Sequence, residues 1–499
     1  MKEAVIRGCI VAVGVLIQIL LSIFIYLFLI DKIFIIHLLF LFFQTIFIVY
    51  FIKYSKNYSQ TLPLIILLLF FPLLGTVICL IIIQNKNKSK LLKNIIESEK
   101  ESKKYYIHKE IEKEEIKKKK HLSYLTNYAG FPLSKRNNVT YYPLGELAFE
   151  SMLLELEKAK EFIFLEYFII CPGTMWNKII EILKRKVKEG VEVRVMYDDA
   201  GCIATLNKNY DKELKKLGIK CVVFNKLHPV SGLIMNNRDH RKILVIDGKI
   251  VFSGGINLAD EYININSPYG HWKDNGIKIE GEAVWSYTVM FLTLWNAFLK
   301  EDMDYTKYKK EIKKEIKENG ITIPYAETPL DQEQTGEDVY LNIINQAEDY
   351  VYIFTPYLII DTDVINALIL AAKRGVDVRL IIPGIPDKKI VYTLSESYLE
   401  ILIKGGVKLY KYTKGFVHGK VFISDDKIAT VGTINLDFRS LYLHFECGVY
   451  LEEVDCIKEI KQDLVETLKE SHQVTEKEAT PKFFKSIWQA ILRLFAPLM

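Results

Sequence analysis

Two short segments of the chain carry a histidine, a lysine and an aspartate at one shared spacing, H-x-K-x-x-x-x-D. The residues are His240, Lys242 and Asp247 in the first segment and His418, Lys420 and Asp425 in the second. In both segments, six residues separate the aspartate from a G-x-x-N sequence that ends at Asn257 or Asn435. A single match fits an edge strand with solvated polar side chains, but a second match with the same tail indicates a functional repeat.

Imidazole and ammonium groups at this spacing suit chemistry on a phosphodiester. One imidazole can attack phosphorus to form a covalent intermediate, and the other can protonate the leaving alcohol and then deprotonate the incoming one. We expect an aspartate beside each imidazole to fix its tautomer and orientation. The paired lysines and asparagines would hold the non-bridging oxygens as their charge grows. His240 is the first choice for the nucleophile and His418 for the acid/base, and the reverse order stays open.

The elements that must position these residues occur twice in the same order. Alternate residues of a strand share one face, so the histidine and lysine of each segment are expected on the same face of a strand. The repeated elements are buried strands at 162–170 and 351–360, helices at 177–187 and 363–373, and further strands within 188–199 and 373–383. This order predicts an α/β fold with mixed, largely parallel sheets and a pseudo-twofold arrangement over one cleft, although periodicity leaves antiparallel strands open. We expect the lysine-rich run 308–320 to form a solvated helix that joins the halves.

The first 84 residues are strongly apolar. The runs 8–30, 33–52 and 62–83 are each long enough to cross a bilayer as a helix. The sequence therefore predicts two or three transmembrane helices. Two spans and an interfacial first segment are the alternative, because Lys2 and Arg7 favour the cytoplasmic side.

A charged segment follows the apolar runs. Between Lys86 and Lys120 there are 13 lysines and 7 glutamates, which predicts a helical or partly disordered linker. The positive-inside bias places this segment and the rest of the chain in the cytoplasm, where it would attract anionic lipid. The intervening glutamates and the apolar runs argue against nucleic-acid binding. The seven cysteines show no disulfide framework, which agrees with a cytoplasmic domain.

These features divide the chain into five predicted parts. They are transmembrane helices in 1–84, a basic charged linker in 85–125, a first catalytic half in 126–320, a second half in 321–480 and an amphipathic helix in 481–499. Apolar side chains of the last part, among them Phe484 and Trp488, fall on one helical face. That helix either lies in the lipid headgroup plane or docks on the protein's own core.

The paired motif resembles that of the phospholipase D superfamily, and further stretches resemble the bacterial cardiolipin synthases. The stretches are LEYF at 165–168, HWKD at 271–274, TPY at 355–357, GFVHGK at 415–420 and GTINLDFRSLYLHFE at 432–446. The similarity extends from about residue 33 to 499. It implies that Glu446 is a carboxylate that steadies an active-site histidine, with a surface ion pair as the alternative. Trp272 and Asp274 are expected to shape the pocket. His444 stands where the family more often has asparagine, and its role is left open.

The resemblance also implies a reaction and a location. Two anionic phosphatidylglycerol molecules would react at the plasma membrane to give cardiolipin and glycerol, with no cofactor. No metal is expected, because the sequence shows no carboxylate cluster or Cys/His spacing typical of a metal site. The rival interpretations are a membrane-bound phospholipase D, another phosphatidyltransferase such as a phosphatidylserine synthase, and a non-catalytic membrane scaffold. A nuclease is the weakest alternative.

Overall fold

The computed structural model describes residues 33–54, 58–80, 90–106, 114–226 and 237–498, without positions 73, 78, 115, 303, 313, 314 and 332, together with Leu16, Leu20 and Ile23. The chain forms two compact units. The first contains Met1–Lys90, Leu227–Asn236 and Ala490–Met499, and the second contains Leu91–Lys226 and Asn237–Gln489. Apart from Leu227–Asn236, both predicted catalytic halves belong to the second unit.

The first unit contains the helices α2 (Ile33–Tyr54) and α3 (Tyr58–Phe70). They contact each other, and the Gln44 side-chain amide donates a 2.6 Å hydrogen bond to the Leu68 carbonyl oxygen. The predicted spans 33–52 and 62–83 overlap these helices, whereas the predicted span 8–30 falls almost wholly outside the described residues. Over the described part of the chain, no helix combines the length and apolarity that crossing a membrane requires.

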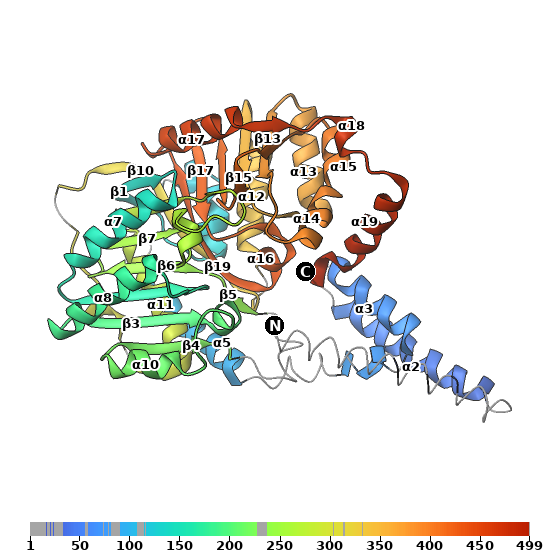
Figure 1. Cartoon of the computed structure of the whole chain (residues 1–499), viewed down its shortest axis with the longest axis horizontal. Helices are drawn as coiled ribbons and strands as arrows, with labels where there is room; N and C mark the ends of the chain where they lie inside the picture. Colours follow the sequence, from blue (N-terminus) through green and yellow to red (C-terminus); the bar gives the residue numbers. More distant parts are fainter. Residues whose placement is uncertain are drawn as a thin grey trace. The chain divides into compact units, whose positions relative to one another are not determined.

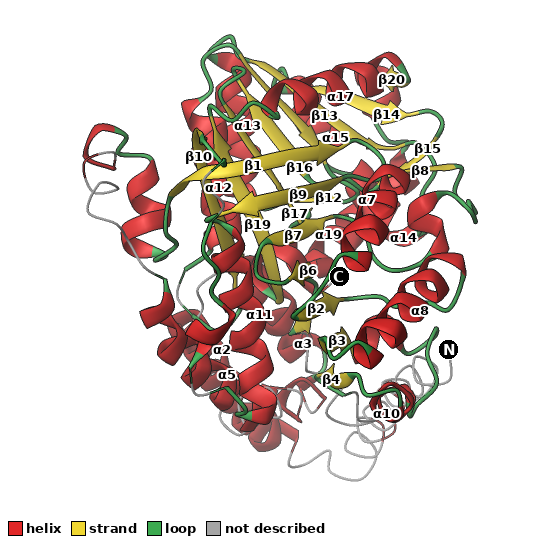
Figure 2. Cartoon of the chain, turned by 90° about the vertical axis from the view of Figure 1, so that its left-hand side faces the viewer, coloured by secondary structure: helices red, strands yellow, loops and turns green. Residues whose placement is uncertain are grey.

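The second unit is built on one mixed sheet of 16 strands (Figures 1 and 2). The strands before residue 300 are β1 (Ser134–Tyr142), β2 (Phe162–Tyr167), β3 (Glu192–Asp198), β4 (Lys220–Phe224), β5 (Arg238–Asp239), β6 (Lys242–Ile246), β7 (Ile250–Gly254) and β9 (Gly276–Gly281). The later strands are β10 (Glu318–Glu327), β11 (Tyr350–Phe354), β13 (Asp377–Pro383), β14 (Lys408–Tyr412), β16 (Val421–Ser424), β17 (Ile428–Gly432), β19 (His444–Glu452) and β20 (Ser471–Gln473). Two short parallel pairs lie outside this sheet: β8 (His271–Lys273) with β15 (Gly415–Val417), and β12 (Leu358–Ile359) with β18 (Leu436–Asp437).

The strand order repeats in the two halves. One half reads β4-β3-β2-β6-β7-β9 and the other reads β14-β13-β11-β16-β17-β19, and the two meet through the antiparallel strands β1 and β10. Figure 2 shows this order along the sheet, from β14 near the top to β4 near the bottom. The predicted pseudo-twofold duplication is therefore present in the topology.

The prediction that the sheets are largely parallel is wrong. Among the described strands of the sheet, parallel pairing is confined to β2-β3-β4, β11-β13-β14 and the short pair β5-β19, and the other neighbouring strands pair antiparallel. The reason lies in the connections. Strands β6 and β7, like β16 and β17, are joined by tight turns, whereas a parallel connection needs a crossover of a dozen residues or more.

Helices cover both sides of the sheet. In the first half, α7 (Gly145–Glu157) and α8 (Thr174–Lys188) lie on one side and the buried helix α11 (Val284–Leu299) on the other (Figure 2). Helix α8 and helix α13 (Thr362–Lys373) confirm the two helices predicted in the repeated elements. The remaining helices of this half are α5 (Lys90–Ser102), α9 (Asp199–Cys202) and α10 (Tyr210–Lys216). The later helices are α12 (Thr335–Gln346), α13 (Thr362–Lys373), α14 (Lys389–Glu396), α15 (Leu399–Lys404), α16 (Phe438–Tyr442), α17 (Ile457–Lys469), α18 (Glu476–Ala479) and α19 (Phe483–Phe495).

The predicted helix over 308–320 is wrong. A 3₁₀ turn ends at Tyr308, strand β10 begins at Glu318, and the described residues between them are not helical. The segment is held to the protein, because Ile316 is buried and its carbonyl oxygen accepts a hydrogen bond from Arg136 Nε at 3.3 Å. The predicted boundary between residues 320 and 321 consequently falls inside β10.

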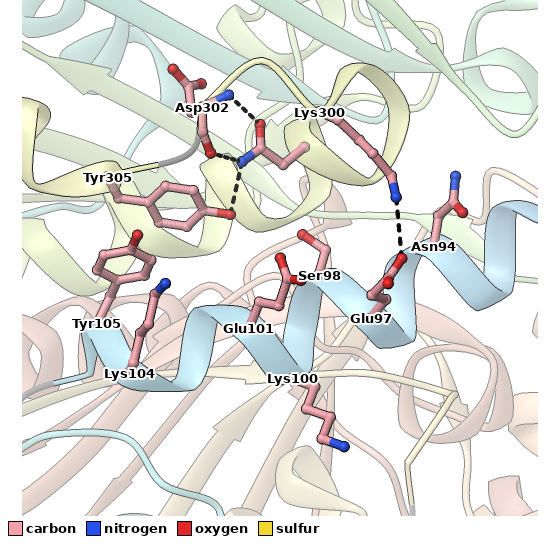
Figure 3. Close-up of a pocket in the computed structure, with 11 residues that line it drawn as sticks. Asn94, Glu97, Ser98, Lys100, Glu101, Lys104, Tyr105, Lys300, Asp302 and Tyr305 are labelled. Carbon is pink, nitrogen blue, oxygen red and sulfur yellow. Dashed lines mark hydrogen bonds and ion pairs between the residues drawn. The ribbon is translucent and has the colours of Figure 1, made fainter.

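Helix α5 of the charged linker packs on the first half. On α5, Ser98 Oγ donates to the Thr293 carbonyl oxygen at 2.6 Å, and Asn94 Nδ2 donates to the Ala297 carbonyl oxygen at 3.1 Å. Beyond α5, the Tyr105 ring stacks on the Tyr305 ring at 4.3 Å. Polar residues of α5 and of the end of α11 line a pocket with a volume of about 550 Å³. Figure 3 shows the residues that line it. The helical part of the linker prediction is confirmed, and this part is docked rather than free.

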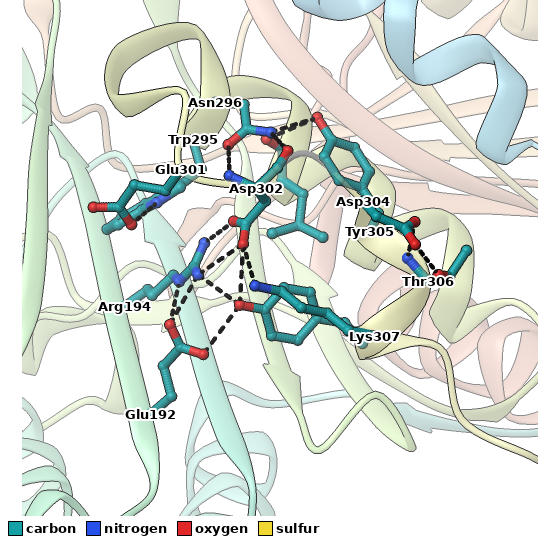
Figure 4. Close-up of polar contacts among 12 residues, drawn as sticks. Glu192, Arg194, Trp295, Asn296, Glu301, Asp302, Asp304, Tyr305, Thr306 and Lys307 are labelled. Carbon is teal, nitrogen blue, oxygen red and sulfur yellow. Dashed lines mark hydrogen bonds and ion pairs between the residues drawn. The ribbon is translucent and has the colours of Figure 1, made fainter.

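A buried arginine fastens the same end of the first half. Arg194 on β3 lies 5.1 Å from the centres of both the Phe164 and Trp295 rings. Its guanidinium donates to Asp302 at 2.5 Å and to Glu192 at 2.8 Å (Figure 4). Because these partners come from β3 and from the segment after α11, the network connects that segment to the sheet.

Candidate active site

His240 lies directly before β6 and is held by a carboxylate of the other half. Its Nδ1 atom is 2.8 Å from Glu446 Oε1 and 3.0 Å from Glu446 Oε2, on β19. Thr433 Oγ1 donates a 2.5 Å hydrogen bond to Glu446 Oε2. Since a carboxylate only accepts hydrogen bonds, His240 carries its proton on Nδ1 and keeps the Nε2 lone pair free for chemistry. The contact expected of Glu446 is present.

His418 lies before β16 and has the reciprocal arrangement. Its Nδ1 atom is 2.6 Å from Oδ2 of Asp274, which follows β8 in the first half. The rings of Trp272 and Tyr262 lie 5.2 and 5.4 Å from the imidazole. Although burial alone would raise the pKa of Asp274, His418 and Lys420 lower it below the ordinary value. Asp274 is therefore an ionised partner of the imidazole, and its role in shaping a pocket remains a prediction.

The two halves of the chain approach each other closely at the His418 half-site. A Cβ atom on Gly255 would lie 2.0 Å from Asp274 Oδ1 and 3.1 Å from the His418 carbonyl oxygen. Only glycine fits at this position, between a residue of each half. His418 and Lys420 both contribute to the lowered pKa of His240, so the two buried half-sites lie within electrostatic range of each other.

The two lysines of the motif are almost fully buried beside the histidines. Lys242 Nζ donates to the His240 carbonyl oxygen at 2.5 Å, and Lys420 Nζ lies 3.0 Å from His418 Nδ1. Burial lowers the pKa of Lys242 to about 8, against the opposing effect of Glu446. Burial likewise lowers the pKa of Lys420 to about 7, with Asp274 opposing and Lys242 adding to the decrease. An anion in this site would favour the charged form of both.

Both motif histidines are neutral near pH 7 without a ligand. Burial, followed by Lys242 and Lys420, lowers the pKa of His240 well below its ordinary value. Burial and Lys420 lower the pKa of His418 to about 4, while Asp274 acts in the opposite direction. His418 therefore has an ionised carboxylate that stabilises its charged form, and this is the property that a general acid needs.

The prediction that Asp247 and Asp425 lie beside the imidazoles is wrong. Asp247 accepts hydrogen bonds of 2.7–2.9 Å from the backbone amides of residues 160–162, at the start of β2. Asp425 accepts hydrogen bonds of 2.8–3.0 Å from the amides of residues 348–350, at the start of β11. Each aspartate lies five residues beyond its lysine, and about 3.3 Å per residue carries it roughly 16 Å along the strand. The carboxylates beside the histidines are Glu446 and Asp274.

The two asparagines of the motif differ in their contacts. Asn257 Oδ1 accepts from the Ile169 amide at 3.1 Å, and its Nδ2 donates to the Tyr262 hydroxyl at 2.8 Å. Asn257 therefore positions the tyrosine that lies against His418. Asn435 is buried, and its Oδ1 has no hydrogen-bond partner among the described residues. The role of both amides in holding phosphate remains a prediction.

His444 adds a third imidazole to the site. Its ring centre lies 5.6 Å from that of His240, and its Nδ1 atom is 3.8 Å from Glu446 Oε1. Burial lowers the pKa of His444 to about 4. Spacing could not reveal this neighbour of His240, because about 200 residues separate the two.

The chain is similar to several known proteins. The family described as cardiolipin synthase, PLD-like domain, matches residues 152–295 and 340–468, and each range contains one histidine–lysine pair. An uncharacterized protein of Streptococcus mutans is 46% identical over 91% of this chain and 99% of its own length. A cardiolipin synthase of Alkalihalophilus pseudofirmus is 33% identical over 89% of this chain and 90% of its own length. The crystal structure of a Haemophilus influenzae phosphatidylserine synthase matches with a TM-score of 0.58 and 15% identity, covers 76% of this chain and 98% of its own, and shows likeness of fold alone.

The backbone contacts of Asp425 predict a structural role. Asp425→Asn keeps one acceptor oxygen but presents an NH₂ group to amide donors, so we expect it to lower the free energy of unfolding by about 1–3 kcal/mol. Urea denaturation followed by tryptophan fluorescence measures the change. The control is Asp426→Asn at the neighbouring exposed position, where loss of the Lys461 ion pair should cost less than about 1 kcal/mol. Equal stability of Asp425→Asn and wild type would contradict the assignment.

Proposed function

Because the chain belongs to the cardiolipin synthase family of phospholipase D-like proteins, we propose that it transfers a phosphatidyl group from one phosphatidylglycerol to another, with cardiolipin and glycerol as products. The observation that carries this proposal is the pair of buried histidines, each held by a carboxylate of the opposite half. A phosphodiester exchange needs a nucleophile and an acid in opposite protonation states, and the two half-sites supply one imidazole each.

In the first step, His240 Nε2 attacks the phosphorus of the donor lipid. Because Asp274 and the anionic phosphate of the donor both favour the charged form of His418, this imidazole takes up a proton on Nε2 when the lipid binds. A nitrogen–phosphorus bond then forms, the bond from phosphorus to the glycerol headgroup oxygen breaks, and the His418 imidazolium gives its Nε2 proton to that oxygen. In the second step, the hydroxyl of another phosphatidylglycerol gives its proton to His418 and attacks phosphorus. The nitrogen–phosphorus bond then breaks, and His240 is regenerated. The energy of one phosphodiester is kept in the other, so no nucleotide is consumed.

The assignment of His240 as nucleophile rests on the environment of the two rings. Burial and both lysines keep His240 neutral, whereas Asp274 favours the charged form of His418. Lys242 and Lys420 would stabilise the charge that grows on the non-bridging oxygens. Glu446 and Asp274 hold the Nδ1 atoms, which directs each Nε2 atom to the substrate.

We further propose that the chain works at the cytoplasmic face of the plasma membrane, where its lipid substrates are. The first 84 residues support attachment: α2 has no charged residue between Ile33 and Ile52, and side chains such as Leu39 and Phe42 are exposed. A helix that is apolar all round and exposed requires an apolar surrounding. Two or three spans remain the prediction from the sequence. Extraction of membranes with alkaline carbonate should leave the protein in the pellet, and its release would contradict attachment.

The decisive test supplies the purified full-length protein with labelled phosphatidylglycerol in detergent micelles. We expect labelled cardiolipin and free glycerol without any nucleotide. His240→Ala and His418→Ala should each abolish the product, whereas His472→Asn, at an exposed histidine paired with Glu478, should not change it. Phosphatidic acid as main product would favour a phospholipase, a need for a nucleotide-activated lipid would favour another phosphatidyltransferase, and no reaction with unchanged cellular lipids would favour a scaffold.

We expect the replacement of Asp274, the carboxylate partner of His418, to lower kcat. Asp274→Asn retains an acceptor for His418 Nδ1 but no charge to stabilise the imidazolium, so kcat should fall by about 100- to 10,000-fold. Steady-state kinetics with short-chain phosphatidylglycerol separates kcat from KM. Asp426→Asn is the matched control, because it makes the same chemical change outside the site. A loss confined to KM would contradict this role.

The lysine pKa values predict the alkaline limb of the pH profile. Lys420, with its pKa at about 7, is charged below that pH and neutral above it, so kcat/KM should fall as pH rises through about 7. Lys420→Arg keeps its charge, and the limb should then move towards about 8, where Lys242 loses its proton. The profile of kcat/KM against pH for the two proteins checks this. An unmoved limb in Lys420→Arg would show that another group controls it.

A further inference from the structure

One wall of the site has the composition of a metal centre. His240, His444 and Glu446 each offer one ligand atom, these atoms all lie within 4.8 Å of one another, and all three residues are buried. Two imidazole nitrogens and one carboxylate oxygen are a ligand set that binds Zn²⁺ and leaves a fourth position open.

Without such a ligand, the ring nitrogens of His444 have no partner among the described residues. It is 7% exposed, and neither of its ring nitrogens has a hydrogen-bond partner in the described part of the chain. Its Nδ1 atom is 3.8 Å from Glu446 Oε1, which exceeds hydrogen-bond length. A buried polar group without a partner is costly, and a bound ion between His444 and Glu446 would satisfy it.

We propose that His240, His444 and Glu446 bind a late first-row divalent cation of the Zn²⁺ class, and that the bound ion inhibits the enzyme. Imidazole-rich sites favour Zn²⁺, Cu²⁺ or Ni²⁺, whereas Mg²⁺ and Ca²⁺ require oxygen ligands. Inhibition rests on the proposed function, because His240 is the nucleophile in that reaction. Binding rests on the ligand geometry alone.

The shared histidine makes metal and substrate compete. An ion on Nε2 of His240 would occupy the attacking lone pair. An ion on Nδ1 would replace the proton now shared with Glu446, release that proton to solvent and withdraw electron density from the ring. The ammonium groups of Lys242 and Lys420 oppose a cation, so we expect reversible binding that is weaker than at a structural zinc site.

The test uses the full-length protein in detergent with Zn²⁺ and Co²⁺ as probes. Competition with a chromophoric chelator measures the Zn²⁺ dissociation constant, and visible absorption reports the coordination of Co²⁺. His444→Asn should weaken Zn²⁺ binding at least about 10-fold and remove the Co²⁺ absorption. His472→Asn controls for surface histidines and should change neither. His444→Gln repeats the comparison if the asparagine variant does not fold.

Activity is then measured at increasing Zn²⁺, with each protein compared with its own metal-free rate. We expect inhibition of wild type and His472→Asn that phosphatidylglycerol relieves, and at least about 10-fold weaker inhibition of His444→Asn. Equal Zn²⁺ affinity of wild type and both His444 variants would overturn the site, whatever the enzyme's activity. Tight binding with unchanged or increased turnover would overturn inhibition. Zinc binding by a protein that does not make cardiolipin would instead overturn the proposed function and leave the site standing.

Discussion

Two hydrogen bonds that cross between the halves, from His240 to Glu446 and from His418 to Asp274, are the interactions on which the site depends. Each carboxylate is buried, and an ionised carboxylate away from water is stable only with a charged or hydrogen-bonding partner. That partner belongs to the other half of the chain. Neither half can therefore form a complete site alone, and the continuous sheet through β1 and β10 keeps the two in register.

The charged groups of the empty site favour the binding of an anion. Two buried lysines lie near two buried carboxylates, Glu446 and Asp274. The lysine pKa values of about 7 and 8 show that, even with these carboxylates, the lysines hold their protons only weakly. A phosphodiester adds the negative charge that both lysines lack. Substrate binding and protonation of the lysines are consequently coupled, and the lysines hold their protons most weakly when the site is empty.

The sequence predicted features that depend on residues close together in the chain, and it missed contacts between residues that only the fold brings together. The histidine and lysine of each motif are two residues apart, so spacing alone identified them, and the repeated strand–helix–strand order indicated the duplication. Asp247 and Asp425 belong to the same repeated motif, but they accept hydrogen bonds from backbone amides at the far end of the strand. The spacing of the motif does not reveal this difference. Asp274 is 144 residues from the histidine it contacts, and its role appears only when β8 pairs with β15. The pairing of the strands was predicted wrongly because an apolar strand has the same sequence pattern in a parallel and in an antiparallel sheet.

The pseudo-twofold symmetry also shows where the two half-sites differ. Counted back from the carboxylate, the second residue is Trp272 in one half and His444 in the other. The Trp272 ring lies 5.2 Å from that of His418, and the His444 ring lies 5.6 Å from that of His240, so the two residues occupy equivalent places. An indole can only donate a hydrogen bond, whereas an imidazole can also accept one or bind a cation. The side chain at this one position thus gives the His240 half-site a chemistry that the His418 half-site cannot have, on an otherwise duplicated frame.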